Sequence, residues 1–476
     1  MPFEHDEPLH ARSHLRSLSE DVLVERPDEQ DTRLRVVTRW GEFVFDDVTP
    51  GVRVAMERMS MGPNSVANIE PASREERAEL RRMLDLLSGS VVHTLRLDDD
   101  GGALLSVVPV AEHARFAVAD IKPDQPVRLS RFAAIRAGRE ELVLDSAVAP
   151  FQVVLHRALT YRAVFSLGRT TTVAELAGVL RAAPPVVADL VGYLVAAGVV
   201  LREPDGADDH STLAGWSHHD LMFHARTRIG RDLLTPAVSR DGPAPPVTRP
   251  LPPGPRFPLY RPESDDLVDS GPSLTRVIET DRLRRIVSDR PLDAKQLGEL
   301  LYRAARVRSV SAVSPADHSG VSYETSDRPY LSIAGLYELE LYVTINRCAE
   351  LPRGIYHYDP AGHALTLVND SPADLSALLD NARIAAGRRE HPPALITVTA
   401  RADRLLWLMS GTGYATTLMH LGALQQTLHL VAAAAGLATY PLALDTTDTT
   451  ERALRLDWPA EVGIGECVVG YRHPLP

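Results

Sequence analysis

The stretch RPYLSIAGLYELELYV, from Arg328 to Val343, decides the fold of the C-terminal half of the chain. Its second part continues into ELELYVTIN, Glu338 to Asn346, which has the pattern of a β-strand. On both sides of it, helical and strand patterns alternate. Helices are expected over 293–305, 372–386 and 413–436, and strands over 365–368, 394–400 and 465–470. This alternation predicts an α+β or α/β domain in which helices sandwich a sheet.

The N-terminal half has a different pattern. A strand pair is expected over 34–45, a charged helix over 74–87 and a further strand over 104–110. The segment from Val173 to Glu203 then predicts a short helix, a proline turn, a second helix and, after Gly198, an apolar strand, which is typical of a winged helix. The second helix has no basic residue and contains Asp189, so we expect this module to bind a peptide rather than a nucleic acid.

A proline-rich segment, DGPAPPVTRPLPPGPRFPLYRP from Asp241 to Pro262, separates the two halves. Repeated prolines forbid helix and favour an extended connection. We therefore predict an N-terminal α+β domain over 1–149, a winged-helix-like module with its connector over 150–235, a proline-rich linker over 236–268 and a C-terminal domain over 269–476.

Composition limits the function. A chain of 476 residues with 44% hydrophobic residues is globular, and its net charge of -12 argues against nucleic acid or an anionic membrane as the main partner. The two cysteines, Cys348 and Cys467, cannot form a disulfide framework. The N-terminal residues have no signal-peptide pattern, and the longest apolar runs are shorter than the ~20 residues of a membrane span. We expect a cytoplasmic protein.

A histidine-rich segment raises the question of a metal site. His218, His219 and His224 lie near Asp220, but adjacent histidines point to different faces of a helix. We therefore predict no metal. Cys467 falls in a strand pattern and is expected to be a buried structural thiol rather than a nucleophile.

Arginines gather in DRLRRIVSDRPLDAKQLGELLY, where Arg282, Arg284 and Arg285 could bind a phosphate or could form a solvated basic helix face. The order of this cluster, RPYLSIAGLYELELYV and GIYHYDP (Gly354 to Pro360) resembles the nitroreductase-like flavoproteins. More narrowly it is similar to the SagB-type dehydrogenases, over Leu274 to Arg472. Upstream, WSHHDLMFHARTRIGR is similar to the segment that joins the winged-helix region to the flavin domain in members from thiopeptide-like clusters.

The resemblance implies a C-terminal nitroreductase-like α/β sandwich and an N-terminal winged-helix-containing region that binds a leader peptide. It also implies FMN as cofactor and the oxidation of thiazolines and oxazolines to azoles in a ribosomally made peptide. A homodimer with each FMN at the subunit boundary is expected. The expected partners are the modified precursor peptide, in its leader and core parts, and cyclodehydratase proteins.

Several residues match the flavin-binding positions of that family. Arg282 and Arg285 match positions at the phosphate end, Ser332 matches a serine beside the ring, and Gly422 and Gln426 match positions of the helix beneath the flavin. Near the C-terminal end of the sequence, Arg472 could also reach the phosphate. The chain departs from the family pattern at neighbouring positions: Asp281 stands for an arginine, Leu283 for a serine, Leu331 and Glu338 for prolines, His420 for an aspartate, Thr427 for an asparagine and Ala415 for an arginine.

The largest departure lies in RLLWLMSGTGY, from Arg404 to Tyr414. The family has a Trp-Lys-Tyr-Gly element there, and its lysine and tyrosine assist the oxidation. Aligning Trp407 and Tyr414 places Leu408 and Met409 at those two positions, and neither accepts a proton. The proton that accompanies hydride transfer still needs an acceptor. Tyr414, Tyr337 and His420 are therefore the candidate catalytic residues, with water or the acidity of the substrate as alternatives.

Three functions remain open from the sequence. The first is an FMN-dependent azoline dehydrogenase that has replaced its base; general acid–base help is worth about 10²- to 10⁴-fold, so its loss slows the reaction without forbidding it. The second is a noncatalytic peptide-binding partner of another modifying enzyme. The third is a flavoenzyme with altered oxidation chemistry.

Overall fold

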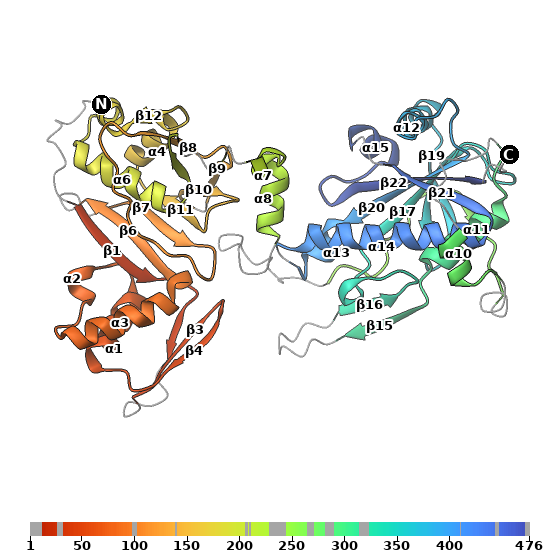
Figure 1. Cartoon of the computed structure of the whole chain (residues 1–476). Coiled ribbons are helices and arrows are strands. Elements are labelled where there is room, and N and C mark those ends of the chain that lie inside the picture. The colour runs from red at the N-terminus through yellow and green to blue at the C-terminus, as the bar shows by residue number, and fades with distance from the viewer. Residues whose placement is uncertain are drawn as a thin grey trace. The chain divides into compact units, whose positions relative to one another are not determined.

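The computed structural model describes residues 12–25, 32–97, 102–138, 140–204, 208, 211–227, 244–263, 271–280, 290–313, 323–409, 411–442 and 447–471. The chain divides into two compact units, Met1–Thr235 and Pro236–Pro476 (Figure 1). Each unit has its own sheets and its own hydrophobic clusters.

Unit 1 contains a seven-stranded sheet in the order β5-β1-β6-β7-β11-β10-β9, and two three-stranded sheets, β12-β8-β13 and β2-β3-β4. The strands are β1 (Arg12–Leu18), β2 (Leu23–Glu25), β3 (Leu34–Thr38), β4 (Gly41–Phe45), β5 (Asn64–Ser65), β6 (Val91–Leu97), β7 (Ala103–Pro109), β8 (Pro126–Leu129), β9 (Ala133–Ala137), β10 (Leu142–Ser146), β11 (Phe151–Leu155), β12 (Thr171–Thr172) and β13 (Val200–Arg202). The helices are α1 (Pro50–Met61), α2 (Val66–Ile69), α3 (Arg74–Leu86), α4 (Ala158–Ser166), α5 (Val173–Leu180), α6 (Pro184–Ala196), α7 (Ser211–Ala214) and α8 (His218–Arg226).

The predicted helix pair of unit 1 is confirmed as α5 and α6. Thr172 caps α5 by accepting from the backbone N–H of Glu175, whose side chain bonds back to the Thr172 N–H, in a capping box. Pro184 begins α6, and Gly198 follows the helix with a φ of 80°, which a residue with a Cβ rarely adopts. Buried residues of α5, α6 and the strands β6, β7 and β11 belong to one hydrophobic cluster, so this module shares its core with the larger sheet.

Unit 2 is built on a seven-stranded antiparallel sheet in the order β14-β19-β18-β17-β20-β22-β21. Its strands are β14 (Arg256–Pro258), β17 (Leu339–Ile345), β18 (Gly354–Asp359), β19 (Ala364–Asn369), β20 (Ala394–Arg401), β21 (Leu437–Leu442) and β22 (Glu461–Tyr471), and a separate hairpin joins β15 (Ser309–Val313) to β16 (Tyr323–Asp327). The helices are α10 (Leu274–Thr280), α11 (Ala294–Ala305), α12 (Pro372–Ala385), α13 (Ala402–Leu406), α14 (Gly413–Ala434) and α15 (Thr447–Leu454).

Helices cover both faces of this sheet, as the alternating pattern predicted (Figure 1). Every residue of β17 is buried, and successive side chains point to opposite faces. Leu341 and Val343 belong to the cluster that contains α11 and α14 residues, whereas Tyr342 belongs to the cluster that contains α12 and α15 residues. The sandwich thus has two cores, and the turn before β17 lies where α14 crosses the sheet.

The described part of the proline-rich segment packs as part of unit 2. Arg256–Pro258 forms the edge strand β14 and pairs with β19, so this part of the segment is integrated into the sheet. The domain boundaries proposed from the sequence stay predictions.

Among the residues that the structure describes, no single helix is long and apolar enough to cross a membrane. The helices α5 and α6 are long and apolar enough only when taken together, and they are bent by 117° relative to each other. No group of three or more His, Cys, Asp or Glu side chains is arranged to hold a metal ion within the part of the chain that the structure describes.

Candidate functional site

The turn before β17, residues 331–338, has an unusual backbone. Ala334 and Tyr337 have φ values of 58° and 45°, in the left-handed region that residues with a Cβ rarely adopt. The Tyr337 N–H donates to Oγ of Ser332 at 3.3 Å and closes the turn. Such conformations cost about 1–3 kcal/mol each and persist only where neighbouring contacts hold them. The side chains that contact this turn must therefore stabilise its strained backbone.

His420 of α14 holds the turn from one side. Its Nε2 lies 2.7 Å from the backbone nitrogen of Ile333, which can only donate, so Nε2 accepts. Nδ1 then carries the ring proton and donates to the carboxyl oxygens of Glu338, at 2.9 and 3.0 Å. His420 is 2% exposed and Glu338 is 0% exposed. The imidazole links α14 to both ends of the turn.

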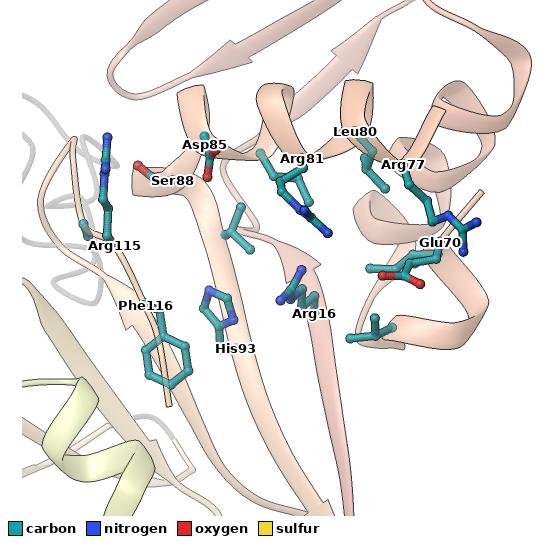
Figure 2. A pocket seen from close by; sticks show the side chains of 15 residues that line it. Arg16, Glu70, Arg77, Leu80, Arg81, Asp85, Ser88, His93, Arg115 and Phe116 are labelled. Atoms are coloured by element: carbon teal, nitrogen blue, oxygen red, sulfur yellow. The ribbon is translucent and has the colours of Figure 1, made fainter. Parts of the chain in front are cut away.

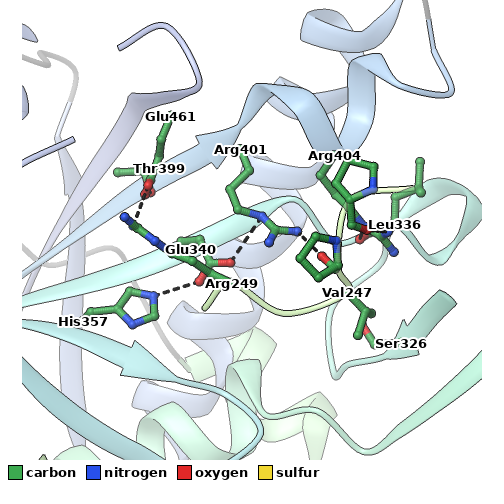
Figure 3. Close-up of polar contacts among 12 residues, drawn as sticks. Val247, Arg249, Ser326, Leu336, Glu340, His357, Thr399, Arg401, Arg404 and Glu461 are labelled. Carbon is green, nitrogen blue, oxygen red and sulfur yellow. Dashed lines mark hydrogen bonds and ion pairs between the residues drawn. The ribbon is translucent and has the colours of Figure 1, made fainter. Parts of the chain in front are cut away.

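Arg404 holds the turn from the other side, through backbone carbonyls (Figure 3). It lies on α13 and is 0% exposed. Its Nε donates to the carbonyl of Leu336 at 3.0 Å, and its other nitrogens donate to the carbonyls of Pro245 and Glu324. Burial, together with the nearby charges of Arg401 and Arg328, lowers the pKa of Arg404 to about 10. One guanidinium group thus joins the turn, strand β16 and the proline-rich segment.

Two more arginines bind the same proline-rich stretch, which we call the strap (residues 244–250). Arg401 donates to the carbonyl of Pro246 at 2.7 Å, and Arg328 donates to that of Val247 at 3.4 Å. Three consecutive strap carbonyls, starting with that of Pro245, are therefore each bound by an arginine of the sandwich. The strap is anchored beside the turn.

A buried polar group lies behind the strap, on the face of β17 opposite α14 (Figure 3). His357 Nε2 is 2.9 Å from Glu340 Oε2, and Arg401 Nε is 3.6 Å from the other Glu340 oxygen. Burial opposes ionisation of Glu340, but the hydrogen bond and charge of His357, with Arg328 and Arg401, hold its pKa below the ordinary value. These charges compensate one another and support the strap.

The side chain of Tyr337 points into the protein. It is buried, and its hydroxyl donates to the carbonyl of Tyr330 at 2.8 Å and lies 3.2 Å from that of Arg328. Burial is the main cause that raises the pKa of Tyr337 above its ordinary value. The phenol fixes the start of the turn.

The opposite face of α14 is open. Tyr414, in the first turn of the helix, is 49% exposed, and Gly422 and Gln426 are exposed further along it. A Cβ added at Gly422 would meet no atom within 4 Å. By contrast, the cavity beside Arg328 and Glu340 has a volume of only about 10 Å³. This cavity is too small for a flat ring, whereas the exposed face of α14 leaves room for one.

Leu408 and Met409, the pair at the predicted base positions, pack against a hydrophobic cluster. The cluster contains Tyr323, Leu336 and Trp407, and Trp407 meets Tyr323 edge-on at 5.6 Å. Both Leu408 and Met409 are only partly buried. They cover the cluster next to the turn without supplying a proton acceptor.

The structure gathers some of the residues that the sequence singled out. Ser332, Tyr337 and His420 meet at the turn, while Tyr414, Gly422 and Gln426 lie along α14. Arg282, Arg285 and Arg472, the predicted phosphate ligands, lie outside the described residues.

Two residues at the turn are not among the predicted site residues. Glu338 stands out in the sequence only as a departure from the family pattern, and Arg404 only as the single titratable group shortly before Leu408. The sequence signal that could have pointed to this pair is that Glu338 and His420 both differ from the residues of the resembling family.

Comparisons with protein families identify the two parts of the chain. Residues 284–471 match the nitroreductase family, and residues 127–233 match the family of the cyanobactin oxidase ThcOx. The match to the nitroreductase family lies in unit 2, and the match to the cyanobactin oxidase family lies in unit 1. This confirms the predicted fold class and the resemblance to oxidases of modified peptides. No curated protein matches the chain.

Several solved structures are similar to part of this chain at low sequence identity. A nitroreductase from Ralstonia eutropha JMP134 is 22% identical and covers 49% of this chain and 100% of its own, with a TM-score of 0.36. The E. coli microcin synthetase McbBCD, in complex with truncated pro-MccB17, is 22% identical over 45% of this chain and 78% of its own, with a TM-score of 0.33. An FMN-dependent nitroreductase from Clostridium difficile R20291 is 11% identical over 42% of this chain and 89% of its own, with a TM-score of 0.27.

Proposed function

We propose that the protein is an FMN-dependent dehydrogenase that oxidises thiazolines or oxazolines to azoles in a ribosomally made, post-translationally modified peptide. The observation that carries this proposal is the exposed face of α14, opposite the strained turn that His420 and Arg404 hold, in a region that matches the nitroreductase family. The cyanobactin-oxidase-like region in the same chain supports a peptide substrate.

The open face suits FMN by its shape. The space over Gly422 leaves room for a flat ring, and Gln426 is an exposed polar group about one helical turn further along α14. Ser332 is proposed as a flavin contact on the family resemblance alone. Arg282, Arg285 and Arg472 are proposed to bind the phosphate, because guanidinium groups bind phosphate oxygens in pairs. When bound, FMN supplies a hydride acceptor. The turn is proposed to hold α14 in place from the face that points away from the ring.

The reaction removes two hydrogens from the azoline ring. One ring carbon loses a hydride, its neighbour loses a proton, and the bond between them becomes a double bond. We assign the proton transfer to Tyr414, whose side chain is exposed on the open face, with solvent as the final acceptor. Tyr337 and His420 are assigned as positioning residues, because the Tyr337 hydroxyl is already bonded to backbone carbonyls just before the turn and the His420 ring is bonded to the turn itself.

The Tyr414 assignment has a direct test. Tyr414→Phe removes the hydroxyl and should lower kcat by about 10- to 100-fold with little change in KM or in flavin content. Tyr161→Phe, which removes a hydroxyl bonded to the Leu155 carbonyl in unit 1, is the matched control and should leave kcat unchanged. An unchanged kcat in Tyr414→Phe would transfer the proton role to water or to the substrate.

A second function is favoured by one observation. Leu408 and Met409 form part of a hydrophobic surface where the resembling enzymes have a lysine and a tyrosine. A chain that had lost the reaction but kept its peptide-binding region would act as a noncatalytic partner of another modifying enzyme. A flavoenzyme with altered oxidation chemistry would also fit that substitution.

The quaternary structure and location belong to the same proposal. Exposed apolar side chains, Leu331 and Ile333 in the turn and Leu418 and Met419 on α14, suit a second copy of this chain packing over the flavin in a homodimer. Cyclodehydratase proteins that make the azoline are the proposed further partners. Because the proposed substrate is made on the ribosome, we propose that the reaction takes place in the cytoplasm.

Absorbance spectroscopy tests the cofactor. The purified protein should show flavin bands, and FMN should be released on denaturation. A colourless protein that does not take up added FMN would remove both the dehydrogenase and the altered flavoenzyme, and would leave the noncatalytic partner.

A further inference from the structure

Unit 1 contains a groove that the proposed oxidation does not use (Figure 2). Two adjoining cavities, of about 320 and 390 Å³, share the lining residues Arg16, Val66, His93 and Phe116. Together they form one continuous feature, which we call the β1–α3 groove. It lies over a face of the seven-stranded sheet of unit 1.

Regular secondary structure places the lining side chains. Arg16 of β1 stands opposite His93 of β6 in the strand register, so both side chains rise from the same face as the floor. On α3, Arg77, Leu80, Arg81 and Leu84 line the groove at helical spacing and form one wall. Cationic and apolar side chains therefore alternate along the same wall.

Aromatic rings form the other wall. Phe116 stacks on His93 with ring centroids 4.3 Å apart, and its ring centroid lies 5.0 Å from that of Tyr193 on α6. Burial, with a smaller contribution from the charge of Arg16, lowers the pKa of His93 to about 3. The imidazole is therefore neutral near pH 7, and the stack presents an uncharged aromatic surface.

The arginine side chains of the groove have guanidinium N–H groups that are available to bind a ligand. Within the described residues, the side chains of Arg16, Arg81 and Arg115 have no carboxylate within ion-pair distance and make no hydrogen bond, while the side chain of Arg77 donates to the carbonyl of Ala72 at 3.2 Å. Figure 2 shows Arg16 and Arg81 turned into the space between β1 and α3. Glu70, Asp85 and Asp189 also line the groove, so four guanidinium groups meet three carboxylates there in a chain whose net charge is -12.

We propose that the β1–α3 groove binds an acidic peptide segment, with carboxylate side chains at Arg16 and Arg81 and an apolar or aromatic side chain against Phe116 and Val66. Separate cations spaced along an apolar surface match carboxylates spread along a chain, whereas one phosphate would engage a single cluster. The inference rests on the proposed function in taking the peptide substrate as the partner. It assigns that substrate a binding site within unit 1, in addition to the oxidation site proposed in unit 2.

Fluorescence anisotropy tests the groove with the full-length protein. The probe is a fluorescein-labelled synthetic peptide of roughly ten residues in which Asp and Glu alternate with Leu and Phe, a length suited to an extended segment. It should bind, and binding should weaken as salt is raised. Arg81→Glu should weaken binding by about tenfold or more, because it sets like charge against the peptide. Arg16→Glu should act in the same direction.

Arg82→Glu is the matched control, because Arg82 is an exposed neighbour on α3 that does not line the groove. Equal weakening by Arg81→Glu and Arg82→Glu would overturn the proposal. So would equal affinity for a peptide whose Leu and Phe are replaced by Ser, or displacement by inorganic phosphate at matched ionic strength, since both indicate a general anion site. Flavin content is measured on the same samples. If the peptide does not bind but flavin is present, the groove proposal alone is wrong; if flavin is absent, the cofactor assignment is wrong.

Discussion

His420 Nδ1 lies 2.9 Å from Glu338 Oε1, and both side chains are buried. These residues are two of the positions at which the chain departs from the family pattern, where the resembling enzymes have an aspartate and a proline. The side chains at these two positions are hydrogen-bonded to each other, and the other ring nitrogen of His420 accepts from the backbone N–H of Ile333. A proline needs no partner to stiffen a turn, whereas the glutamate at this position depends on the histidine.

The pair should behave as one energetic unit. His420→Leu leaves the carboxyl group of Glu338 buried without its donor and should lower the free energy of unfolding by about 3–5 kcal/mol. The double variant Glu338→Leu/His420→Leu should lose at least about 1 kcal/mol less than the sum of the single changes. Urea unfolding followed by tryptophan fluorescence measures this. The solvent-accessible His391–Asp380 pair is the control and should show little coupling. Strict additivity at Glu338 and His420 would show that the two side chains do not act together.

Arg404 should be irreplaceable by lysine. Its guanidinium group donates to the carbonyls of Leu336, Pro245 and Glu324, which an ammonium group cannot reach together. Arg404→Lys should therefore destabilise the protein by about 2–4 kcal/mol and reduce retained flavin. Thermal unfolding and the flavin-to-protein absorbance ratio measure both effects. Arg389→Lys, at an exposed position of unit 2, is the control; equal behaviour of the two variants would show that the turn needs no such anchor.

Much of unit 2 could be predicted from the sequence, because its signals are local. The strand at Leu339–Ile345 and the helix at Gly413–Ala434 appear where apolar patterning placed them. Ser332 and His420 are found only through the resemblance, since neither lies in a self-sufficient motif. Their meeting at Ile333 depends on the crossing of α14 over the sheet, which patterning does not specify.

Other features could not be predicted, for physical reasons. Arg404 binds carbonyl groups, and a carbonyl acceptor has no residue identity to find in a sequence. Glu338 and His420 are 82 residues apart, and neither departure by itself indicates the other. The β1–α3 groove combines Arg16, Arg81 and Phe116 from three separate segments, so no single stretch indicates it.

The stability of unit 1 should depend on pH through His93. Its folded-state pKa of about 3 lies below the ordinary value of 6.5, so the unfolded chain binds the proton more readily between these values. This contribution to stability is complete above pH 6.5 and is lost as the pH falls toward about 3. His93→Phe keeps a ring against Phe116 and should lose less stability than the parent between about pH 7 and pH 5 in thermal melts. Parallel pH profiles would show that the dependence does not come from His93.

Restoring a proton acceptor should change the rate. Leu408→Lys/Met409→Tyr places an amine and a phenol at the positions where the resembling enzymes have them, and it should raise kcat by about tenfold or more. Because both residues cover a hydrophobic cluster, the variant should also be less stable. Leu408→Met is the control for packing alone. Unchanged activity in a folded double variant would show that the acceptor lies elsewhere.

Hydride transfer from a peptide azoline to bound FMN is the step on which the proposed function depends. It is measured most directly by anaerobic mixing of the flavin-loaded protein with a thiazoline- or oxazoline-containing peptide, followed by the flavin absorbance and the peptide mass. We predict that the flavin bands bleach and that the peptide loses two hydrogens per ring oxidised. Flavin bands that persist with several such peptides, while a chemical reductant still bleaches them, would contradict the proposed dehydrogenase.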